Sequence, residues 1–93
     1  MIIEHHTFRL VAGIADEDFL AADKRVQEEF SMHQFGFVRR TTARAGAEWL
    51  IESMWWFGDN AEDALRSDHD TVVTLRELID ADTESVRRYE TLD

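Results

Sequence analysis

Residues 48–57 read EWLIESMWWF, and this stretch decides the fold because it is apolar on both sides of an extended chain. Successive side chains of a strand point to opposite faces. One face carries Trp49, Ile51, Trp55 and Phe57, and the other carries Leu50, Met54 and Trp56. A strand with one face in water alternates more cleanly between apolar and polar residues. The stretch therefore predicts cover on both faces, by helices of the same chain and by a second copy of the chain. The alternative is a monomer with one exposed aromatic patch.

Three further segments are predicted to be strands. Residues 35–44 contain Phe, Val and two Thr, and the Gly-containing turn at 45–46 joins them to 48–57 as a hairpin. Residues 2–10 mix Ile, Thr and Phe with polar residues, and residues 84–92 carry Val86 and Tyr89 as bulky members. These segments predict an antiparallel sheet with the second and fourth strands at its edges.

Two helical regions separate the strands. Residues 16–32 place Phe19, Ala22, Val26 and Phe30 at helical spacing, behind Asp16 as a predicted N-cap. A second region starts at Asp59 in a sequence like a capping box and runs to residue 67. After a break at 68–70, Asp70 is predicted to cap a further helical piece, and 80–83 to form a connection.

The predicted order of elements is β-α-β-β-α-β, a ferredoxin-like α+β domain covering residues 1–93. The chain has no cysteine, which excludes disulfides and thiolate metal sites. Its net charge of −10 disfavours nucleic acids and anionic membranes as partners. The N-terminus does not resemble a signal peptide, so a cytoplasmic protein is predicted.

Several short motifs resemble the dimeric α+β barrel superfamily, which includes the antibiotic-biosynthesis monooxygenases and the stress-responsive α/β-barrel proteins. The motifs are Phe8-Arg9-Leu10 before a Gly-containing turn, Phe35-Gly36-Phe37, Trp56 before the second helical region, and Arg87-Arg88-Tyr89-Glu90. The resemblance implies dimerisation through the sheets and a pocket between sheet and helices. It also implies activities that range from cofactor-free oxidation of aromatic polyketides to none. The Asn-rich, Trp-containing site of the monooxygenases is not recognisable here.

The resemblance places two histidines at the pocket. In several enzymes of the superfamily, a His of the first strand and a His near the second helix line it, and His6 and His69 occupy comparable positions. If Phe8 faces the helices, His6 does too, whereas the adjacent His5 faces the partner. His6 and His69 are therefore the candidate catalytic residues, as acid–base or polarising groups. The alternatives are a hydrogen-bonded strand-end histidine for His6 and a solvated loop for His69.

Four other residues are candidate ligand-binding residues, namely Phe8, Arg40, Glu52 and Trp56. Arg40 could bind a substrate carboxylate, and a flat aromatic substrate could stack on a tryptophan. Glu52 lies between apolar residues, and a salt bridge to Arg40 on the neighbouring strand is the favoured interpretation over a role as a base. His33 is expected on the buried stripe of the first helix, where the negative helix end explains it.

No metal site and no cofactor are predicted. Asp68-His69-Asp70 suggests metal binding, but it would need ligands from elsewhere in the chain. Two functions remain open at this point. One is a cofactor-independent, monooxygenase-like enzyme that acts on a small apolar or aromatic molecule. The other is a non-catalytic homodimer that binds a small ligand or serves a structural role.

Overall fold

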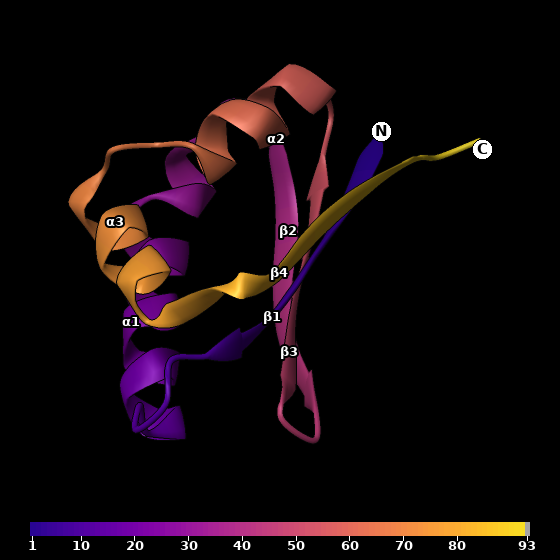
Figure 1. The fold of residues 1–93 in the computed structure, drawn as a ribbon. Helices are drawn as coiled ribbons and strands as arrows, with labels where there is room; N and C mark the ends of the chain where they lie inside the picture. Colours follow the sequence, from indigo (N-terminus) through magenta and orange to yellow (C-terminus); the bar gives the residue numbers. More distant parts are fainter. Residues whose placement is uncertain (93) are drawn as a thin grey trace.

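The computed structural model describes residues 1–92, and its helices pack on one face of a four-stranded sheet (Figure 1). The strands are β1 (Ile2–Leu10), β2 (Phe37–Ala45), β3 (Glu48–Trp55) and β4 (Ile79–Glu90). The helices are α1 (Asp16–Glu29), α2 (Gly58–Leu65) and α3 (Asp70–Glu77), with a 3-10 turn, η1, at Ser31–His33. This order confirms the ferredoxin-like α+β prediction.

The strands lie in the order β2-β3-β1-β4, and every neighbouring pair is antiparallel. The second and fourth strands are therefore the edges, as predicted, and β1 is central. Gly46 closes the β2–β3 hairpin with a φ of +61°, which suits glycine at the first position of a two-residue turn. Because β1 has a neighbour on each side, its inward side chains lie in the middle of the helix-covered face.

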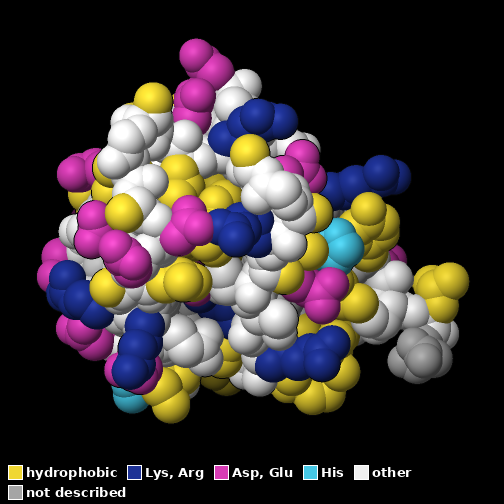
Figure 2. All heavy atoms as spheres, turned by 90° about the horizontal axis from the view of Figure 1, so that it is seen from below, with side chains coloured by type: hydrophobic (Ala, Val, Ile, Leu, Met, Phe, Trp, Pro, Cys, Tyr) yellow, Lys and Arg dark blue, Asp and Glu magenta, His cyan; other side chains and the backbone are white. Residues whose placement is uncertain are grey.

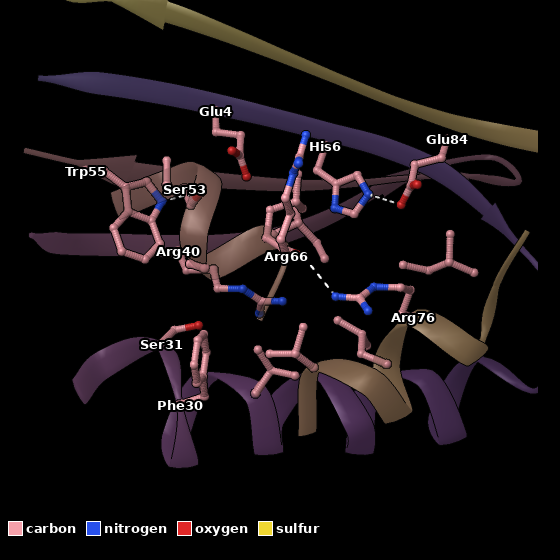
Figure 3. A pocket seen from close by; sticks show the side chains of 18 residues that line it. Glu4, His6, Phe30, Ser31, Arg40, Ser53, Trp55, Arg66, Arg76 and Glu84 are labelled. Carbon is pink, nitrogen blue, oxygen red and sulfur yellow. Dashed lines mark hydrogen bonds and ion pairs between the residues drawn. The ribbon is translucent and has the colours of Figure 1, made fainter. Parts of the chain in front are cut away.

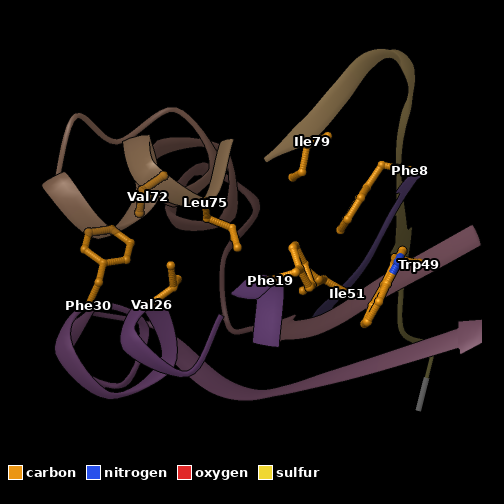
Figure 4. Packing of buried hydrophobic residues seen from close by; sticks show 9 residues of the cluster. All are labelled: Phe8, Phe19, Val26, Phe30, Trp49, Ile51, Val72, Leu75 and Ile79. Carbon is orange, nitrogen blue, oxygen red and sulfur yellow. The ribbon is translucent and has the colours of Figure 1, made fainter. Parts of the chain in front are cut away.

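The helix-covered face carries the hydrophobic core, and its side chains follow the predicted alternation. In β3, every second residue from Trp49 to Trp55 is buried, and in β1 the same holds from Glu4 to Phe8. The buried apolar residues that pack together are Phe8, Phe19, Val26, Phe30, Trp49, Ile51, Val72, Leu75 and Ile79 (Figure 4). The prediction that His6 shares the face of Phe8 is confirmed, and Glu4 lies on the same face.

The helix ends differ from the sequence predictions. The first helix ends at Glu29 and not at residue 32, because the chain tightens into η1. His33 is consequently exposed, and the prediction that it lies on a buried stripe was wrong. It still meets a helix end, since its Nε2 lies 3.0 Å from the carbonyl oxygen of Glu28. That contact fits the expected attraction between imidazole and free helical carbonyl groups.

None of the predicted N-caps is a cap. The cap positions belong to Ala15, Phe57 and His69, each one or two residues before the acidic residue expected there. Asp16 is instead the first residue of α1 and pairs with Arg44. Its negative charge therefore lies in the first turn, where the positive end of the helix dipole attracts it.

The third and fourth strands also have different bounds. β3 ends at Trp55, two residues earlier than expected, and β4 starts at Ile79 in place of the predicted connection at 80–83. The cause is the length of β1, whose end at Arg9 and Leu10 pairs with Asp80 and Ile79 across an irregularity in register. Pairing satisfies backbone groups that a loop would leave to water.

Hydrophobic and charged side chains are interspersed on the face seen in Figure 2, so the surface there is not uniformly acidic. Within residues 1–92, no helix has both the length and the apolar character that crossing a bilayer would require.

Candidate functional site

A cavity of about 350 Å³ lies between the sheet and the helices (Figure 3). Its apolar wall comes from all three helices and from the inner face of the sheet, and consists of Val26, Phe30, Ile51, Trp55, Ala61, Ala64, Leu65, Val72, Leu75 and Ile79. Its polar residues are Glu4, His6, Ser31, Arg40, Ser53, Arg66, Arg76 and Glu84. The volume and the combination of an apolar wall with convergent polar groups are typical of a small-molecule site.

His6 is the central polar residue of this cavity. Its side chain is 8% exposed, and Nε2 lies 2.6 Å from Glu84 Oε2 at the edge strand β4. A carboxylate only accepts hydrogen bonds, so Nε2 donates in this pair, and in a neutral imidazole the other nitrogen, Nδ1, then holds the lone pair. In Figure 3 Nδ1 points into the cavity. The pair therefore fixes both the orientation of the ring and the nitrogen that can accept a proton.

A chain of ion pairs links two lining residues of the cavity, Glu4 and Arg66. Arg88 binds Glu4 through Nε at 2.8 Å and Glu62 through Nη1 at 2.5 Å. Glu62 also holds Nε of the exposed Arg66 at 2.5 Å. Burial alone would lower the pKa of Arg88, but hydrogen bonds and attraction from Glu4 and Glu62 prevail, and the pKa is raised above its ordinary value. The guanidinium thus stays charged, and the Glu4 carboxylate is bound to it.

Arg40 lines the cavity, but its partner is not Glu52. The register pairs Arg40 with Ser53 and places it on the inner face, whereas Glu52 lies on the outer face. Arg40 Nη1 meets Asp23 of α1 at 2.5 Å, and both side chains are about nine-tenths buried. The predicted Arg40–Glu52 salt bridge was therefore wrong. Glu52 precedes Ser53, the residue paired with Arg40, by one position, and consecutive residues of a strand point to opposite faces.

Glu52 and Trp56 lie outside the cavity. Glu52 holds His5 Nε2 at 2.7 Å on the outer face of the sheet, with Arg39 at 3.8 Å. Trp56 follows β3 and is 57% exposed. Phe8 is buried in the core, where its ring packs against His6 with a centroid distance of 4.9 Å. Of the four candidate ligand-binding residues, the structure thus places Arg40 on the cavity wall and Phe8 directly behind it.

His69 takes a local structural position. Its Nδ1 accepts from the backbone N–H of Thr71 at 3.3 Å and lies 2.8 Å from the Thr71 hydroxyl, so His69 caps α3. Its ring packs against Phe30, with the centroids 5.1 Å apart. Among residues 1–92, His6 is the histidine that lines the cavity, and the structure does not bring His69 to it. A catalytic role for His69 stays a prediction.

Three charged residues of the cavity, Glu84, Arg66 and Arg76, were not among the candidates from the sequence. Glu84 could have been found, since it shares a strand face with Val86, the residue that pairs with His6. Arg66 and Arg76 had no such signal, because the path of the chain between α2 and α3 decides where they point.

Among residues 1–92, no group of three or more His, Asp or Glu side chains is arranged to hold a metal ion. Asp68 and Asp70 flank His69, but His69 Nδ1 approaches only Asp70, at 3.2 Å. The sequence Asp68-His69-Asp70 therefore does not assemble a ligand set in this part of the chain.

The same fold occurs in solved structures that differ widely in sequence. SnoaB, a cofactor-independent oxygenase from Streptomyces nogalater, matches with a TM-score of 0.78 and 21% identity over 99% of this chain and 93% of that chain. A candidate antibiotic biosynthesis monooxygenase from Nitrosomonas europaea matches with a TM-score of 0.74 and 15% identity over 100% of both chains. Rv0793 from Mycobacterium tuberculosis matches with a TM-score of 0.72 and 12% identity over 99% and 95%.

Neither a family model nor a curated protein sequence matches the chain. The structural likenesses show the class of fold, a ferredoxin-like α+β protein of the kind found among antibiotic-biosynthesis-monooxygenase-like proteins. The fold predicted from the resemblance in sequence motifs is thereby confirmed. What the chain does with this fold depends on its own site.

Proposed function

We propose that the protein is a cofactor-independent, monooxygenase-like enzyme that acts on a small apolar or aromatic molecule. One observation carries the proposal. Glu84 holds His6 Nε2 at 2.6 Å, so that Nδ1 faces a cavity with mostly apolar walls. A base that is oriented by a carboxylate and within reach of a bound molecule is the arrangement that proton abstraction requires. The shared fold with SnoaB, a cofactor-independent oxygenase, supports the same class of reaction.

The proposed reaction begins with proton transfer to His6. For a substrate with a methylene group between two aromatic rings, Nδ1 takes one proton and leaves a delocalised carbanion. The carbanion gives its electron pair to O2 and forms a C–O bond, and the imidazolium returns its proton to give a hydroperoxide. Loss of the second methylene hydrogen breaks the O–O bond, releases water and leaves a carbonyl group. One oxygen atom ends in the product and the other in water, as in a monooxygenase.

The test uses anthrone, an aromatic ketone with such a methylene group. The purified protein is expected to convert anthrone to anthraquinone and to consume O2 in equal molar amounts, without added metal or flavin. An oxygen electrode and the absorbance of the quinone measure the two quantities. Under nitrogen, the conversion should stop. A rate equal to that of heat-denatured protein would contradict the proposed function.

The alternative is a non-catalytic protein that binds a small ligand. Trp55 lines the cavity, so a bound aromatic molecule is expected to change the tryptophan fluorescence. Saturable binding of anthrone without oxygen consumption would favour this alternative over the enzyme.

We also propose that two copies of the chain pack through their outer sheet faces. On that face Ile3 pairs directly with Met54 on one side and with Tyr89 on the other, which makes an apolar strip across three strands. Tyr89 is 41% exposed, and Trp56 continues the apolar surface beyond β3. Exposed apolar surfaces of this kind usually mark interfaces.

The variant Met54→Asp is expected to convert a dimer into a single chain, because it places a charge within the apolar strip. Analytical ultracentrifugation at micromolar concentration measures the mass. Leu20→Asp is the matched control, since Leu20 is equally apolar and 47% exposed but lies on α1. A wild-type mass of one chain would rule out the dimer.

A further inference from the structure

Three arginine side chains from three elements line the same cavity. Arg40 comes from β2, Arg76 from α3, and Arg66 directly follows α2. In Figure 3 Arg40 and Arg76 point toward one another from opposite sides of the cavity. The sequence has twice as many acidic as basic residues. A cavity lined by three arginines is therefore a local exception in an acidic protein.

Arg76 is held in place without a counter-ion. Its Nη2 donates to the carbonyl oxygens of Leu65 and Ser67, at 3.0 and 3.1 Å. These acceptors orient the guanidinium, but a carbonyl group has no net charge. Within the described residues, no carboxylate lies at ion-pair distance from Arg76, so its positive charge is not neutralised locally.

Arg40 is a buried charge on the same cavity. Its side chain is 8% exposed and meets Asp23 Oδ1, while Asp23 Oδ2 accepts the hydroxyl hydrogen of Thr42 at 2.5 Å. Burying a guanidinium is costly, and its attraction to one carboxylate offsets only part of that cost. A buried, oriented arginine beside an open volume is a common way to recognise a carboxylate, because the planar group can donate two parallel hydrogen bonds.

The two carboxylates that line the cavity are both engaged by other side chains. Glu84 is bound to His6, and Glu4 is bound to Arg88, whose raised pKa keeps it charged. Both lining carboxylates are thus already paired with donors. Among the lining arginines of the described residues, Arg76 is the one without a carboxylate at ion-pair distance, and it points toward Arg40.

We propose that the cavity binds an aromatic or apolar molecule that carries a carboxylate group. The carboxylate lies between Arg40 and Arg76, the apolar body packs against the helical wall at Val26 and Phe30, and the reactive end faces His6. This inference names the substrate class of the site described above, and thus rests on the proposed function for its meaning in catalysis. The binding itself does not depend on any reaction.

The test compares two probes of the same shape, 2-naphthoate and 2-naphthamide, by isothermal titration calorimetry. Naphthoate is expected to bind at least ~10-fold more tightly, because hydrogen bonds between two charged groups are stronger than those to a neutral amide. Arg76→Gln is expected to lower the affinity for naphthoate by about 10-fold or more and to leave that for naphthamide unchanged. Lys24→Gln is the matched control, since it removes one positive charge at an exposed site on α1.

Arg40 needs a paired variant. Arg40→Gln alone leaves Asp23 as a buried carboxylate without its partner and endangers folding. The double variant Asp23→Asn with Arg40→Gln removes both charges, and its preference for naphthoate over naphthamide is expected to be at least ~10-fold smaller. A thermal melt of each variant verifies that it is folded.

The outcomes separate this inference from the proposed function. Equal affinity for the two probes, or no effect of Arg76→Gln, overturns the inference even if anthrone is oxidised. A preference for naphthoate that depends on Arg76 supports the inference even if no oxygen is consumed.

Discussion

Replacing His6 by glutamine is expected to lower the rate of anthrone oxidation by about 10²–10⁴-fold, the range for loss of a positioned general base. The amide nitrogen of glutamine can still donate to Glu84, so the Glu84 carboxylate keeps a hydrogen-bond donor. No atom of glutamine can accept a proton as Nδ1 does. The variant thus removes the base with little other change, and its melting temperature should stay close to that of the wild type.

The adjacent residue supplies the control. His5 forms the same kind of pair, with Nε2 at 2.7 Å from Glu52, but on the outer face of the sheet. His5→Gln should therefore keep the wild-type rate, provided that its oligomeric state is unchanged. If His5→Gln and His6→Gln lost activity equally, the chemistry would not depend on the cavity, and the role proposed for His6 would be wrong.

Glu84 is a positioning residue in this scheme. Glu84→Gln is expected to reduce the rate less than His6→Gln, because an amide can still bind the ring but no longer selects the tautomer. Added imidazole provides a further readout. It should partly restore activity in His6→Ala, which leaves a space for it, and it should not restore activity in Glu84→Gln.

Replacing Phe19 by alanine is expected to lower the free energy of unfolding by about 3–5 kcal/mol. Phe19 is 0% exposed and lies between two aromatic rings, with centroid distances of 5.5 Å to Phe8 and 4.7 Å to Trp49. Alanine at this position would leave a cavity between α1 and the sheet, which these two elements cannot close by moving closer. Since small domains have only about 5–15 kcal/mol of stability, the loss would be a large fraction of the total.

Urea denaturation followed by far-UV circular dichroism measures this effect. Leu20→Ala is the neighbouring control, because Leu20 is 47% exposed and its loss is expected to change stability by less than about 0.5 kcal/mol. A change of less than about 1 kcal/mol in Phe19→Ala would contradict the packing of α1 against the sheet as described.

The two histidine–carboxylate pairs lie on opposite faces of the sheet. His5 and His6 are consecutive and each binds a carboxylate, but His6 is enclosed by helices and His5 is not. The pair on the helix-covered face can act on a molecule held in the cavity, where charge interactions are stronger than in bulk water. The outer pair lies beside the apolar strip that we propose as the dimer surface, where Tyr89 contacts the His5 ring at a centroid distance of 5.3 Å.

The amino-acid sequence by itself determined the element order, the two edge strands and the side of the sheet on which most residues lie. These features follow from local periodicities, two residues for strands and 3.6 for helices, which can be read without knowing any partner. The alternation from Glu4 through Phe8 was therefore predictable, and so was the placing of His6 toward the helices.

Only the tertiary structure decided which charged groups meet. Arg40 binds Asp23, 17 positions earlier on α1, and His6 of β1 binds Glu84 of β4. Arg76 reaches the cavity because α3 packs beside α1 and the chain before it folds back onto its guanidinium. Such pairs depend on strand register, on the irregularity between Thr7 and Arg9, and on how helices dock. Those are set by the whole core at once, and no local pattern contains them.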